Sequence, residues 1–484
     1  MKPNEVGPSL KGIVKGQVLW DKQSLDLYSV DSSSYIIRPL AVTIPKDELD
    51  IIRILKFATK NKIGITPRGA GTGLVGSALG RGIIIDLKNF NKIRIGHNYV
   101  EADCGVFKGN LDRALRKKGR FFPPDPSIGP YCTIGGMVAT NASGSHTLKY
   151  GSTIDNLLSV RMIRPDGKII HLPSKSQFAN RIYDIIKSDG KSGFPGVTKN
   201  SCGYRLDAVT SKSNLQKLIA GSEGTLGIII SAKLKTLPIP KKNALIVLAY
   251  RNIRKAALDS PKIVKLKPSA LEIVDKNIIK HINVILPKNV ECLLFVEFDS
   301  RIKNSVKILR DIVSDAKIVK ILAKKGEIKK WWEYRNSALS YSLRSITSDQ
   351  SMPTVIEDAV VPVEKLVLLV DLIKEISEKY GIEFVLYGHA GNGNLHIRPV
   401  LRQKNKKLIK KIATEFFLKL IQMGGCITGE HGDGLARSEF VKMQYGNRIY
   451  SVFDKVKRRF DPMNILNPGK IITHKSSIIK NLKI

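Results

Sequence analysis

Three glycine-rich segments in the first half of the chain constrain its fold more than any other feature. Their sequences are P-R-G-A-G-T-G-L-V-G-S (67–77), T-I-G-G-M-V-A-T-N-A-S-G (133–144) and G-S-E-G-T-L-G-I (221–228). Glycine lets the backbone turn its N–H groups toward an anion and lets a ligand approach closely. We interpret the segments as loops that wrap around one extended cofactor. For the first of them, a tight loop without a ligand is the alternative.

The first segment formally matches the dinucleotide pattern G-x-G-x-x-G from Gly71 to Gly76. In a Rossmann unit this pattern opens a helix. Here two more glycines follow almost at once, and Ile83–Leu87 has the apolar pattern of a strand. The residues before the segment predict a strand at Ala41–Ile44 and a helix within Lys46–Lys62. The segment is therefore expected to be a phosphate-binding loop without a Rossmann helix.

A second feature is a predicted β-hairpin near the C-terminus, with apolar residues on both sides of an Asn-Gly turn that begins at Asn392. A two-residue turn places His389 and His396 opposite each other, with Cβ atoms about 5 Å apart. Two imidazoles at that distance can share a metal ion. Glu430 and His431 would add a third ligand and a base. Surface or hydrogen-bonded histidines without a metal are the alternative.

The length, composition and net charge of the chain indicate a folded protein with an unusually large positive charge. A length of 484 residues suggests two or three domains, and 43% hydrophobic residues suit a globular chain. The net charge is +38, from 80 Lys and Arg against 42 Asp and Glu. The basic runs Lys404–Lys411 and Lys455–Arg459 contain no interleaved aromatic residues for base stacking, so no nucleic-acid partner is expected. A solvated basic surface is the first interpretation, with peripheral membrane association or docking of a partner as alternatives.

The five cysteines are scattered and form no C-x-x-C pair, which argues against an iron–sulfur cluster or a zinc finger. Their odd number argues against a disulfide framework and favours a reducing cytoplasm. Apolar runs such as Leu366–Val370 are far shorter than the roughly 20 residues that span a bilayer. Met1–Asp21 has no signal-peptide core. We expect a cytoplasmic protein, with the inner face of the membrane as the alternative location.

The order of the three glycine-rich segments resembles that of the flavin-binding domain of the vanillyl-alcohol oxidase/p-cresol methylhydroxylase (PCMH) superfamily. The chain also contains G-H-A-G-N-G-N-L-H (388–396), G-E-H-G-D-G (429–434) and N-I-L-N-P-G-K (464–470). With these motifs it resembles the group of D-lactate dehydrogenases, glycolate oxidase D-subunits and D-2-hydroxyglutarate dehydrogenases. The resemblance extends from about Tyr35 to Lys470, and the combination of motifs is specific although each one alone is weak.

This resemblance implies an α+β fold: a two-subdomain FAD-binding domain of the PCMH type, followed by an α+β FAD-linked oxidase C-terminal domain. The expected divisions are an N-terminal segment (1–34), the FAD-binding domain (35–240), a substrate or cap domain (241–425) and a C-terminal segment (426–484) that packs back on the FAD-binding domain. The linker is expected at Pro238–Pro240, where two prolines interrupt the pattern.

The resemblance also implies which residues bind the FAD. Some relatives carry a histidine in the first loop that bonds covalently to the flavin; Thr72 stands there in this chain, so the FAD is expected to be non-covalent. The implied cofactor-binding residues are Pro67, Arg68, Gly69, Ala70, Gly71, Thr72, Gly73, Leu74, Gly76, Ser77, Pro124, Ile134, Gly135, Gly136, Ala139, Thr140, Asn141, Gly144, Gly151, Glu223, Ile228 and Asn467.

By the same resemblance, His389, His396 and Glu430 bind a divalent metal, zinc or manganese. His431 is the implied general base, and Arg335, in W-W-E-Y-R, holds the substrate carboxylate. The implied reaction oxidises a D-2-hydroxy acid, D-lactate or glycolate, to the 2-oxo acid. Hydride passes to flavin N5 while the base takes the hydroxyl proton.

Several positions depart from the pattern of these relatives. Those selective for a second carboxylate carry Thr and Lys where Leu339 and Ile356 stand, which argues against 2-hydroxyglutarate. Arg398 replaces an Asn and Asn392 replaces an Asp. Arg398 could change which acid is bound. Asn392 suits the turn as well as the Asp of the relatives does.

Electrons are expected to leave to a separate, non-NAD acceptor, because the Cys-rich iron–sulfur module of some relatives has no counterpart in this sequence. A quinone, an iron–sulfur partner subunit and an electron-transfer protein are the candidates, and a homodimer is left open. Two other classes stay as alternatives. One is a flavoprotein of the same fold that acts on another substrate, such as an alkylglycerone-phosphate synthase relative or a sugar or alcohol oxidase; the other is an anion-binding protein.

Overall fold

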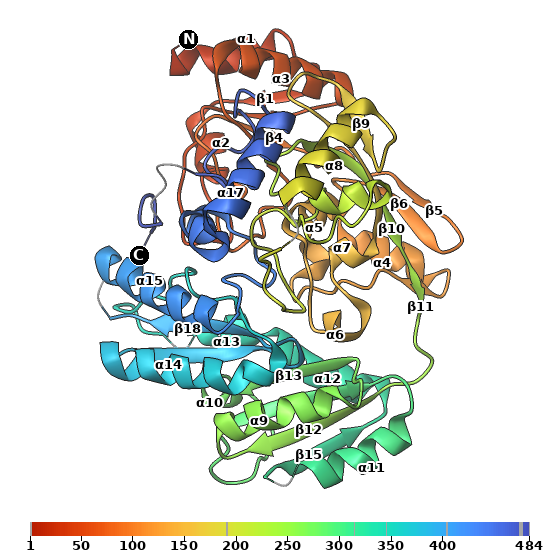
Figure 1. The fold of residues 1–484 in the computed structure, drawn as a ribbon, viewed down its shortest axis with the longest axis vertical. Helices are drawn as coiled ribbons and strands as arrows, with labels where there is room; N and C mark the ends of the chain where they lie inside the picture. Colours follow the sequence, from red (N-terminus) through yellow and green to blue (C-terminus); the bar gives the residue numbers. More distant parts are fainter. Residues whose placement is uncertain are drawn as a thin grey trace.

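A computed structural model of the chain describes residues 2–189, 192–313, 315–344, 346–402, 405–473 and 478–483. Lys404, at the start of one predicted basic run, lies outside these ranges, as do Met1 and residues 474–477 and 484 of the expected terminal segments. Figure 1 shows two parts. The upper part holds the glycine-rich half with helix α17, and the lower part holds a large sheet that the chain enters after β11. The predicted mixture of helices and strands is confirmed.

The first sheet of the upper part has the strand order β1-β2-β4-β3, with β2, β4 and β3 parallel. The predicted strand is confirmed at Ala41–Ile44, and the predicted helix begins after Asp47, whose side chain accepts a hydrogen bond from the Asp50 N–H. Residues 69–82 contain no helix, which confirms that the first glycine-rich segment does not open a Rossmann helix. The elements are β1 (Gln17–Leu19), β2 (Ala41–Ile44), α3 (Glu48–Asn61), β3 (Ile65–Arg68) and β4 (Ile83–Asp86).

A second, antiparallel sheet of the upper part has the order β5-β6-β10-β8-β9. Its strands are β5 (Ile93–Ile95), β6 (Tyr99–Asp103), β8 (Leu157–Ile163), β9 (Ile169–Leu172) and β10 (Ile228–Lys235), and β7 (Arg120–Phe121) pairs with β11 (Leu237–Pro238). The other helices of this half are α1 (Val6–Lys11), α2 (Lys22–Leu27), α4 (Lys108–Arg116), α5 (Ile134–Thr140), α6 (Thr147–Tyr150), α7 (Thr153–Asn156) and α8 (Gln177–Asp189), with 3₁₀ turns at Pro3–Glu5, Gly129–Tyr131 and Lys212–Ile219.

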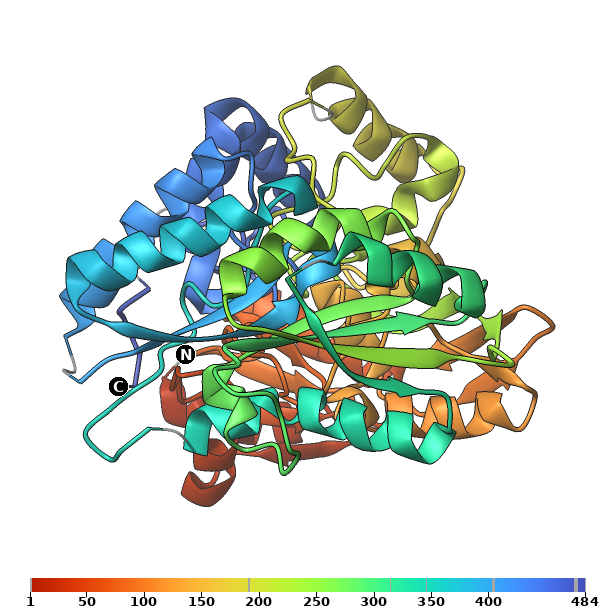
Figure 2. The ribbon, with the colours of Figure 1, turned by 90° about the horizontal axis from the view of Figure 1, so that it is seen from below.

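The lower part is built on a seven-stranded antiparallel sheet with the order β15-β12-β14-β13-β17-β18-β16. Its central strands read as continuous apolar runs because helices cover both faces (Figure 2). Leu245 and Val247 of β12 belong to one core cluster, and Ile246 and Leu248 to the other. The strands are β12 (Ala244–Tyr250), β13 (Ala270–Asp275), β14 (Cys292–Phe298), β15 (Lys317–Leu322), β16 (Ala359–Val360), β17 (Glu383–His389) and β18 (Asn394–Val400).

Most helices of the second half of the chain pack around this sheet, whereas α17 lies in the upper part. The helices of this half are α9 (Ile253–Val264), α10 (Lys276–Ile279), α11 (Ile302–Ile312), α12 (Lys325–Asn336), α13 (Ala338–Arg344), α14 (Leu366–Tyr380), α15 (Lys406–Gln422), α16 (Gly434–Arg437) and α17 (Val441–Phe460), with 3₁₀ turns at Val363–Lys365, Ala390–Asn392 and Ser438–Phe440. Among the described residues, no helix combines the length and the apolar character needed to cross a bilayer.

The hairpin of β17 and β18 exists, but its predicted register is wrong. His389 pairs with Asn394, and His396 pairs with Tyr387, so a loop of residues 390–393 replaces the predicted two-residue turn. The loop forms a 3₁₀ turn before Gly393, whose φ is 65° and which lies against the backbone of Val361. The two histidines nevertheless lie on one face as diagonal neighbours, with ring centroids 5.2 Å apart.

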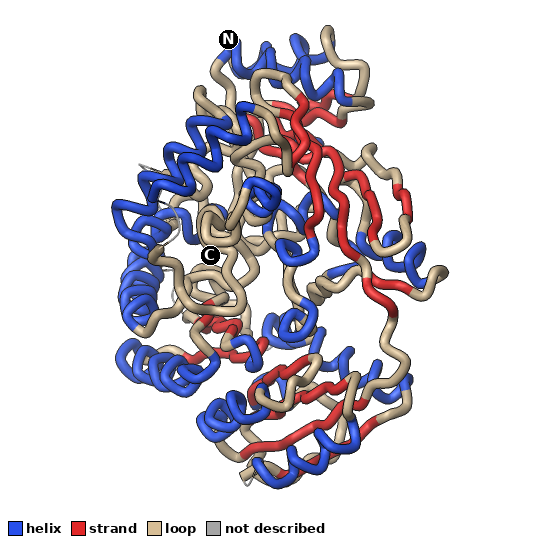
Figure 3. Tube along the Cα trace, turned by 45° about the vertical axis from the view of Figure 1, so that its right-hand side comes forward, coloured by secondary structure: helices blue, strands red, loops and turns tan. Residues whose placement is uncertain are grey.

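The C-terminal segment returns to the upper part of the molecule. The Ile65 N–H donates to the Ile465 carbonyl at 2.6 Å, and the Asn467 N–H donates to the Ile65 carbonyl at 2.7 Å. Figure 3 shows the strands in two groups with loops and helices between them. The expected domain boundaries at residues 35, 241 and 426 stay predictions. Strand β1 lies in the expected N-terminal segment (1–34) but pairs with β2 of the expected FAD-binding domain.

Candidate active site

A cavity of about 290 Å³ lies between the three glycine-rich segments and the hairpin. The prediction that all three segments are loops is wrong for the second, because Thr133 caps helix α5 and residues 134–140 are helical. The upper part contributes residues 67–74 and most of 132–143 to its wall, and the lower part contributes Arg335, Tyr387 and His396. Glu430 and His431, from the loop before α16, also line it. The cavity thus joins the two regions that the sequence singled out separately.

Most of the residues predicted to bind the cofactor lie on this wall. They are Pro67, Arg68, Gly69, Ala70, Gly71, Thr72, Gly73, Leu74, Ser77, Gly135, Gly136, Ala139, Thr140 and Glu223. Within the described residues, the backbone N–H groups of residues 69–74 make no hydrogen bond to a protein group. Such a row of free donors along a cavity suits the pyrophosphate of a dinucleotide.

Eight predicted cofactor residues do not line the wall: Gly76, Pro124, Ile134, Asn141, Gly144, Gly151, Ile228 and Asn467. Some of them support the loops instead. The Asn467 side chain donates to the carbonyls of Ser77 (2.9 Å) and Glu223 (2.6 Å). Gly144 lies so close to Asp125 that a Cβ there would meet its carbonyl oxygen at 2.2 Å. Direct flavin contacts by these eight residues stay a prediction.

Three histidines surround one oxygen of the Glu430 carboxylate. Oε1 lies 3.0 Å from His389 Nε2, 3.3 Å from His396 Nε2 and 3.6 Å from His431 Nε2. The ligand atoms of His389, His396 and Glu430 all lie within 4.8 Å of one another. Two imidazoles and a carboxylate at this spacing fit zinc or manganese and leave coordination positions for a substrate.

The second oxygen of Glu430 is occupied by protein donors. Its Oε2 accepts hydrogen bonds from Ser143 Oγ at 2.6 Å and from Lys199 Nζ at 2.9 Å, and the Lys199 side chain is fully buried. Burial raises the pKa of Glu430, but Lys199 and His389 outweigh this effect and hold it well below its usual range. Glu430 is therefore ionised, and its Oε1 faces the Nε2 atoms of the three histidines, where a cation would lie.

Both predicted ligand histidines have environments that suit metal binding. His389 Nδ1 lies 2.8 Å from Glu272 Oε1, which orients the ring so that Nε2 faces Glu430. Burial lowers the pKa of His396 to about 4, so its imidazole is neutral at physiological pH. A second set of ligand atoms, from Glu357, His396 and His431, has a similar spacing.

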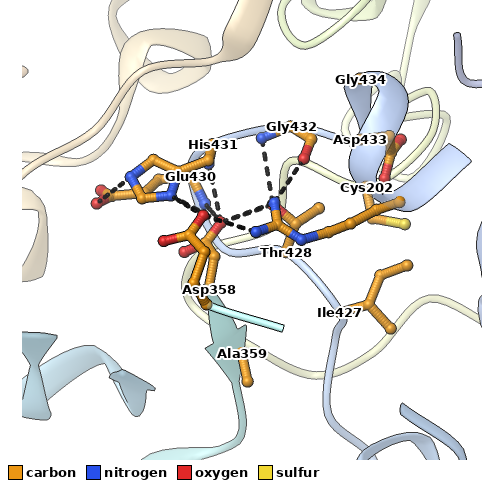
Figure 4. Close-up of polar contacts among 12 residues, drawn as sticks. Cys202, Asp358, Ala359, Ile427, Thr428, Glu430, His431, Gly432, Asp433 and Gly434 are labelled. Carbon is orange, nitrogen blue, oxygen red and sulfur yellow. Dashed lines mark hydrogen bonds and ion pairs between the residues drawn. The ribbon is translucent and has the colours of Figure 1, made fainter. Parts of the chain in front are cut away.

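His431 is held by two consecutive carboxylates that precede β16. Its Nδ1 lies 2.7 Å from Glu357 Oε1. Its backbone N–H donates to Asp358 Oδ2 at 2.9 Å, and Figure 4 shows Asp358 beside the loop that carries Glu430 and His431. Burial lowers the pKa of His431, but Glu357 and Asp358 outweigh this effect and raise it to about 9. Because Nδ1 faces Glu357, the other ring nitrogen, Nε2, lies on the side of Glu430 and the cavity.

Arg335 lies on the cavity wall but is already paired on one side. Its Nε donates to Glu272 Oε2 at 2.7 Å, Nη2 also contacts that oxygen, and Nη1 donates to Ser127 Oγ at 3.3 Å. The side chain is 2% exposed. Nη2 also lies 3.4 Å from His389 Nδ1, so both terminal nitrogens already have protein contacts. A substrate carboxylate at the predicted clamp would share Nη1 and Nη2 with these groups, and the clamp stays a prediction.

The sequence reasoning missed the residues that support the predicted ones. Glu272 had a signal, because it is a charged residue flanked by apolar residues in the run A-L-E-I-V of β13. Glu357 and Asp358 also had one, as adjacent acids before an apolar strand. Ser143 lies within the second glycine-rich segment, but nothing in that pattern pointed to Glu430, and Lys199 comes from a loop with no distinguishing pattern.

The sequence of the chain matches two domain families of known proteins. The description "FAD binding domain" matches residues 39–173, and "FAD linked oxidases, C-terminal domain" matches residues 239–471. The glycolate oxidase subunit GlcD of Bacillus subtilis (strain 168) is 32% identical over 465 residues, with 92% of each chain covered. The chain belongs to the FAD-linked oxidase family. The predicted domain types and FAD as the cofactor of this oxidoreductase are thereby confirmed.

Other relatives of this FAD-linked oxidase have related names. The D-lactate dehydrogenase of Anaerostipes hadrus is 31% identical, with 90% of each chain covered. The D-2-hydroxyglutarate dehydrogenase of Pseudomonas putida is 29% identical over 95% of this chain, which spans only 51% of that protein. Among solved structures, alkyldihydroxyacetonephosphate synthase covers 97% of this chain with a TM-score of 0.67 and 20% identity, which shows a common fold.

Gly69→Ala is expected to weaken FAD binding about tenfold or more. A Cβ at Gly69 would meet Thr133 Oγ1 at 2.1 Å and push the first two glycine-rich segments apart. Overpacking of this kind costs about 1–3 kcal/mol, and about 1.4 kcal/mol corresponds to a factor of ten. Titration of apoprotein with FAD measures the effect. Gly196→Ala is the control, since nothing lies within 4 Å of its added Cβ; equal affinity in the two variants would contradict the expected contact.

Proposed function

We propose that this FAD-linked oxidase oxidises a small D-2-hydroxy acid, D-lactate or glycolate, to the 2-oxo acid, with non-covalent FAD and a divalent zinc or manganese ion. The observation that carries the proposal is the single cavity that joins the N–H-lined loop of residues 69–74 to His396, Glu430 and His431. The names of the relatives GlcD and D-lactate dehydrogenase support the substrate class.

Each protein group has a defined role in this proposal. When bound, FAD accepts a hydride and the divalent ion acts as a Lewis acid toward the substrate hydroxyl. His389, His396 and Glu430 hold the ion. Arg335 binds the substrate carboxylate through its Nη1–Nη2 edge. His431 accepts the hydroxyl proton at Nε2.

The protonation of His431 follows from its neighbours. With the protein carboxylates alone, its pKa of about 9 keeps the imidazole protonated at neutral pH. A divalent cation held at Glu430 repels an imidazolium, so ion binding lowers this pKa and favours the form that accepts a proton. The ligand set and the base are thus electrostatically linked.

The cavity wall favours a small monocarboxylate. Among its described residues, Arg68 belongs to the cofactor loop, and Arg335 is the remaining residue with an arginine or lysine side chain. Leu339 and Tyr387 line the space beside it. Arg398 is buried, does not line the wall, and lies 3.4 Å from Glu357 Oε2. Among the described wall residues, no further arginine or lysine is thus placed for a second substrate carboxylate.

A dye-reduction assay with several acids tests the proposal. We expect turnover with D-lactate or glycolate, less with D-2-hydroxyglutarate, and none with L-lactate. A preference for D-2-hydroxyglutarate would contradict the assigned substrate size. FAD-loaded protein that oxidises none of these acids would point to a flavoprotein of the same fold with another substrate class.

Arg335→Lys is expected to lower kcat/KM about 10- to 100-fold, mainly through KM. Lysine keeps the charge beside Glu272 but loses the planar pair of donors, and hydrogen bonds to charged groups contribute about 1.5–3 kcal/mol. Steady-state kinetics with the preferred acid measures the effect. Arg254→Lys is the matched control, because Arg254 pairs with Asp371 on the surface. Unchanged kinetics in Arg335→Lys would show that the carboxylate binds elsewhere.

We propose a separate acceptor for the electrons. The five cysteines of the described residues are free and buried, and they form no cluster that could hold iron and sulfur. A quinone, an iron–sulfur partner subunit and an electron-transfer protein are the candidates. The net charge of +38 supports a peripheral contact with an anionic membrane as a further hypothesis, and a homodimer is another.

A further inference from the structure

Glu357 is a buried carboxylate behind the proposed base. It is 0% exposed and does not line the cavity. Its Oε1 lies 2.7 Å from His431 Nδ1 and accepts a hydrogen bond from Arg437 Nη2, also at 2.7 Å. Burying an unpaired carboxylate costs free energy of folding, so a buried carboxylate is expected to be paired and to have a structural or functional role.

The surroundings of Glu357 fix its carboxylate in one place. Arg437 is itself held by its Nε bond to the Val355 carbonyl (2.9 Å) and its Nη1 bond to the Gly432 carbonyl (2.8 Å). The Glu357 carbonyl accepts from the Ile397 N–H at 3.1 Å, which ties this residue to β18. Arg398 Nη2 approaches Oε2 at 3.4 Å. The carboxylate therefore has little freedom to move when substrate binds.

This arrangement determines which nitrogen of His431 can accept a proton. Because Nδ1 faces Glu357, the neutral ring carries its proton there and leaves the Nε2 lone pair toward the cavity. The backbone N–H of His431 is held separately by Asp358. An imidazolium formed after proton transfer remains next to the Glu357 negative charge.

We propose that Glu357 is the positioning residue for proton transfer, holding His431 in the tautomer and orientation in which Nε2 takes the substrate hydroxyl proton. This proposal rests on the proposed function. In the step, the O–H bond breaks and an N–H bond forms at Nε2, while the C2–H bond electrons leave as hydride to the flavin. Glu357 touches neither the substrate nor the flavin and acts through His431.

Glu272 offers a matched comparison in the same site. It makes the same kind of contact, 2.8 Å from His389 Nδ1, but to a histidine assigned as a metal ligand. Removing the charge of Glu272 is expected to weaken metal retention about 10- to 100-fold. Removing the charge of Glu357 is expected to leave metal retention unchanged and to slow turnover.

The experiment compares Glu357→Gln and Glu272→Gln in the full-length enzyme loaded with FAD and manganese. For Glu357→Gln we expect a fall in kcat of about 10- to 100-fold, little change in KM, unchanged manganese per chain and a larger solvent deuterium isotope effect. For Glu272→Gln we expect loss of manganese. Thermal unfolding curves check that both proteins fold.

Two results would overturn the assignment of Glu357. One is a kcat and isotope effect equal to those of the unmodified enzyme. The other is loss of manganese in Glu357→Gln, which would make Glu357 a ligand in the set with His396 and His431. If Glu357→Gln does not fold, Glu357→Asp replaces it, because the shorter side chain keeps the charge but cannot reach Nδ1, and the same fall in kcat is expected. A His431→Ala variant with full activity would refute the proposed function itself.

Discussion

His431→Ala is expected to lower kcat for the preferred D-2-hydroxy acid by about 10²- to 10⁴-fold, the usual contribution of a positioned general base. Its Nε2 faces Glu430 Oε1 at 3.6 Å on the wall of the cavity, next to the proposed ligand set. Among the described wall residues, the one other histidine is His396, which is already assigned as a metal ligand. Steady-state assays at saturating acid measure the effect.

The control for this variant is His97→Ala, which removes an exposed imidazole that does not line the cavity. FAD per chain and metal per chain should be unchanged in His431→Ala, since neither group depends on this side chain in the proposal. Activity within a factor of a few of the unmodified enzyme would exclude His431 as the base.

Removal of the divalent ion is expected to lower kcat/KM about 10³-fold, either by chelation or in His396→Ala. A Lewis acid at a developing alkoxide contributes several kcal/mol, and each 1.36 kcal/mol corresponds to about a factor of ten in rate. The His396 ring is buried, and its Nε2 faces Glu430. Metal analysis and assays before chelation, after it, and after addition of zinc or manganese measure the effect.

His171→Ala is the matched control for the ligand variant, because His171 is exposed on β9. The added ion should restore chelated enzyme but not His396→Ala. Full activity of metal-stripped enzyme would remove the metal from the mechanism, and rescue of His396→Ala by excess ion would show that the remaining ligands suffice.

Local patterns in the sequence predicted a large part of the upper half. The glycines of 67–77 and the strand that follows them too soon excluded a Rossmann helix, and the structure has none there. The strand Ala41–Ile44 and the helix predicted within Lys46–Lys62 also follow from apolar periodicity. These features depend on neighbours in the chain, which is why sequence reasoning reached them.

The register of the hairpin depended on contacts that the sequence does not display. Asn392-Gly393 favours a two-residue turn by itself, but β17 and β18 are each paired on their outer side, with β13 and β16. Gly393 also lies against Val361. These tertiary contacts select a four-residue loop, and the two histidines meet diagonally instead of directly.

The supporting residues of the site were out of reach for a similar reason. Lys199 and Glu430 are 231 positions apart, and Ser143 and Glu430 are 287 apart. Arg335 was predicted to hold the substrate carboxylate, and this role stays a prediction. Its side chain lines the cavity, but its contact with Glu272 of β13 shows that part of its hydrogen-bonding capacity is already used. Only the folded arrangement reveals such partners.

Anaerobic mixing of the FAD-loaded and metal-loaded enzyme with D-lactate or glycolate is the most direct test of hydride transfer from a D-2-hydroxy acid to the flavin. The visible absorbance of oxidised flavin should fall in a single turnover without nicotinamide cofactor, and the 2-oxo acid should form in equal amount. Flavin that stays oxidised with every D-2-hydroxy acid tested, in protein shown to hold both FAD and metal, would contradict the account.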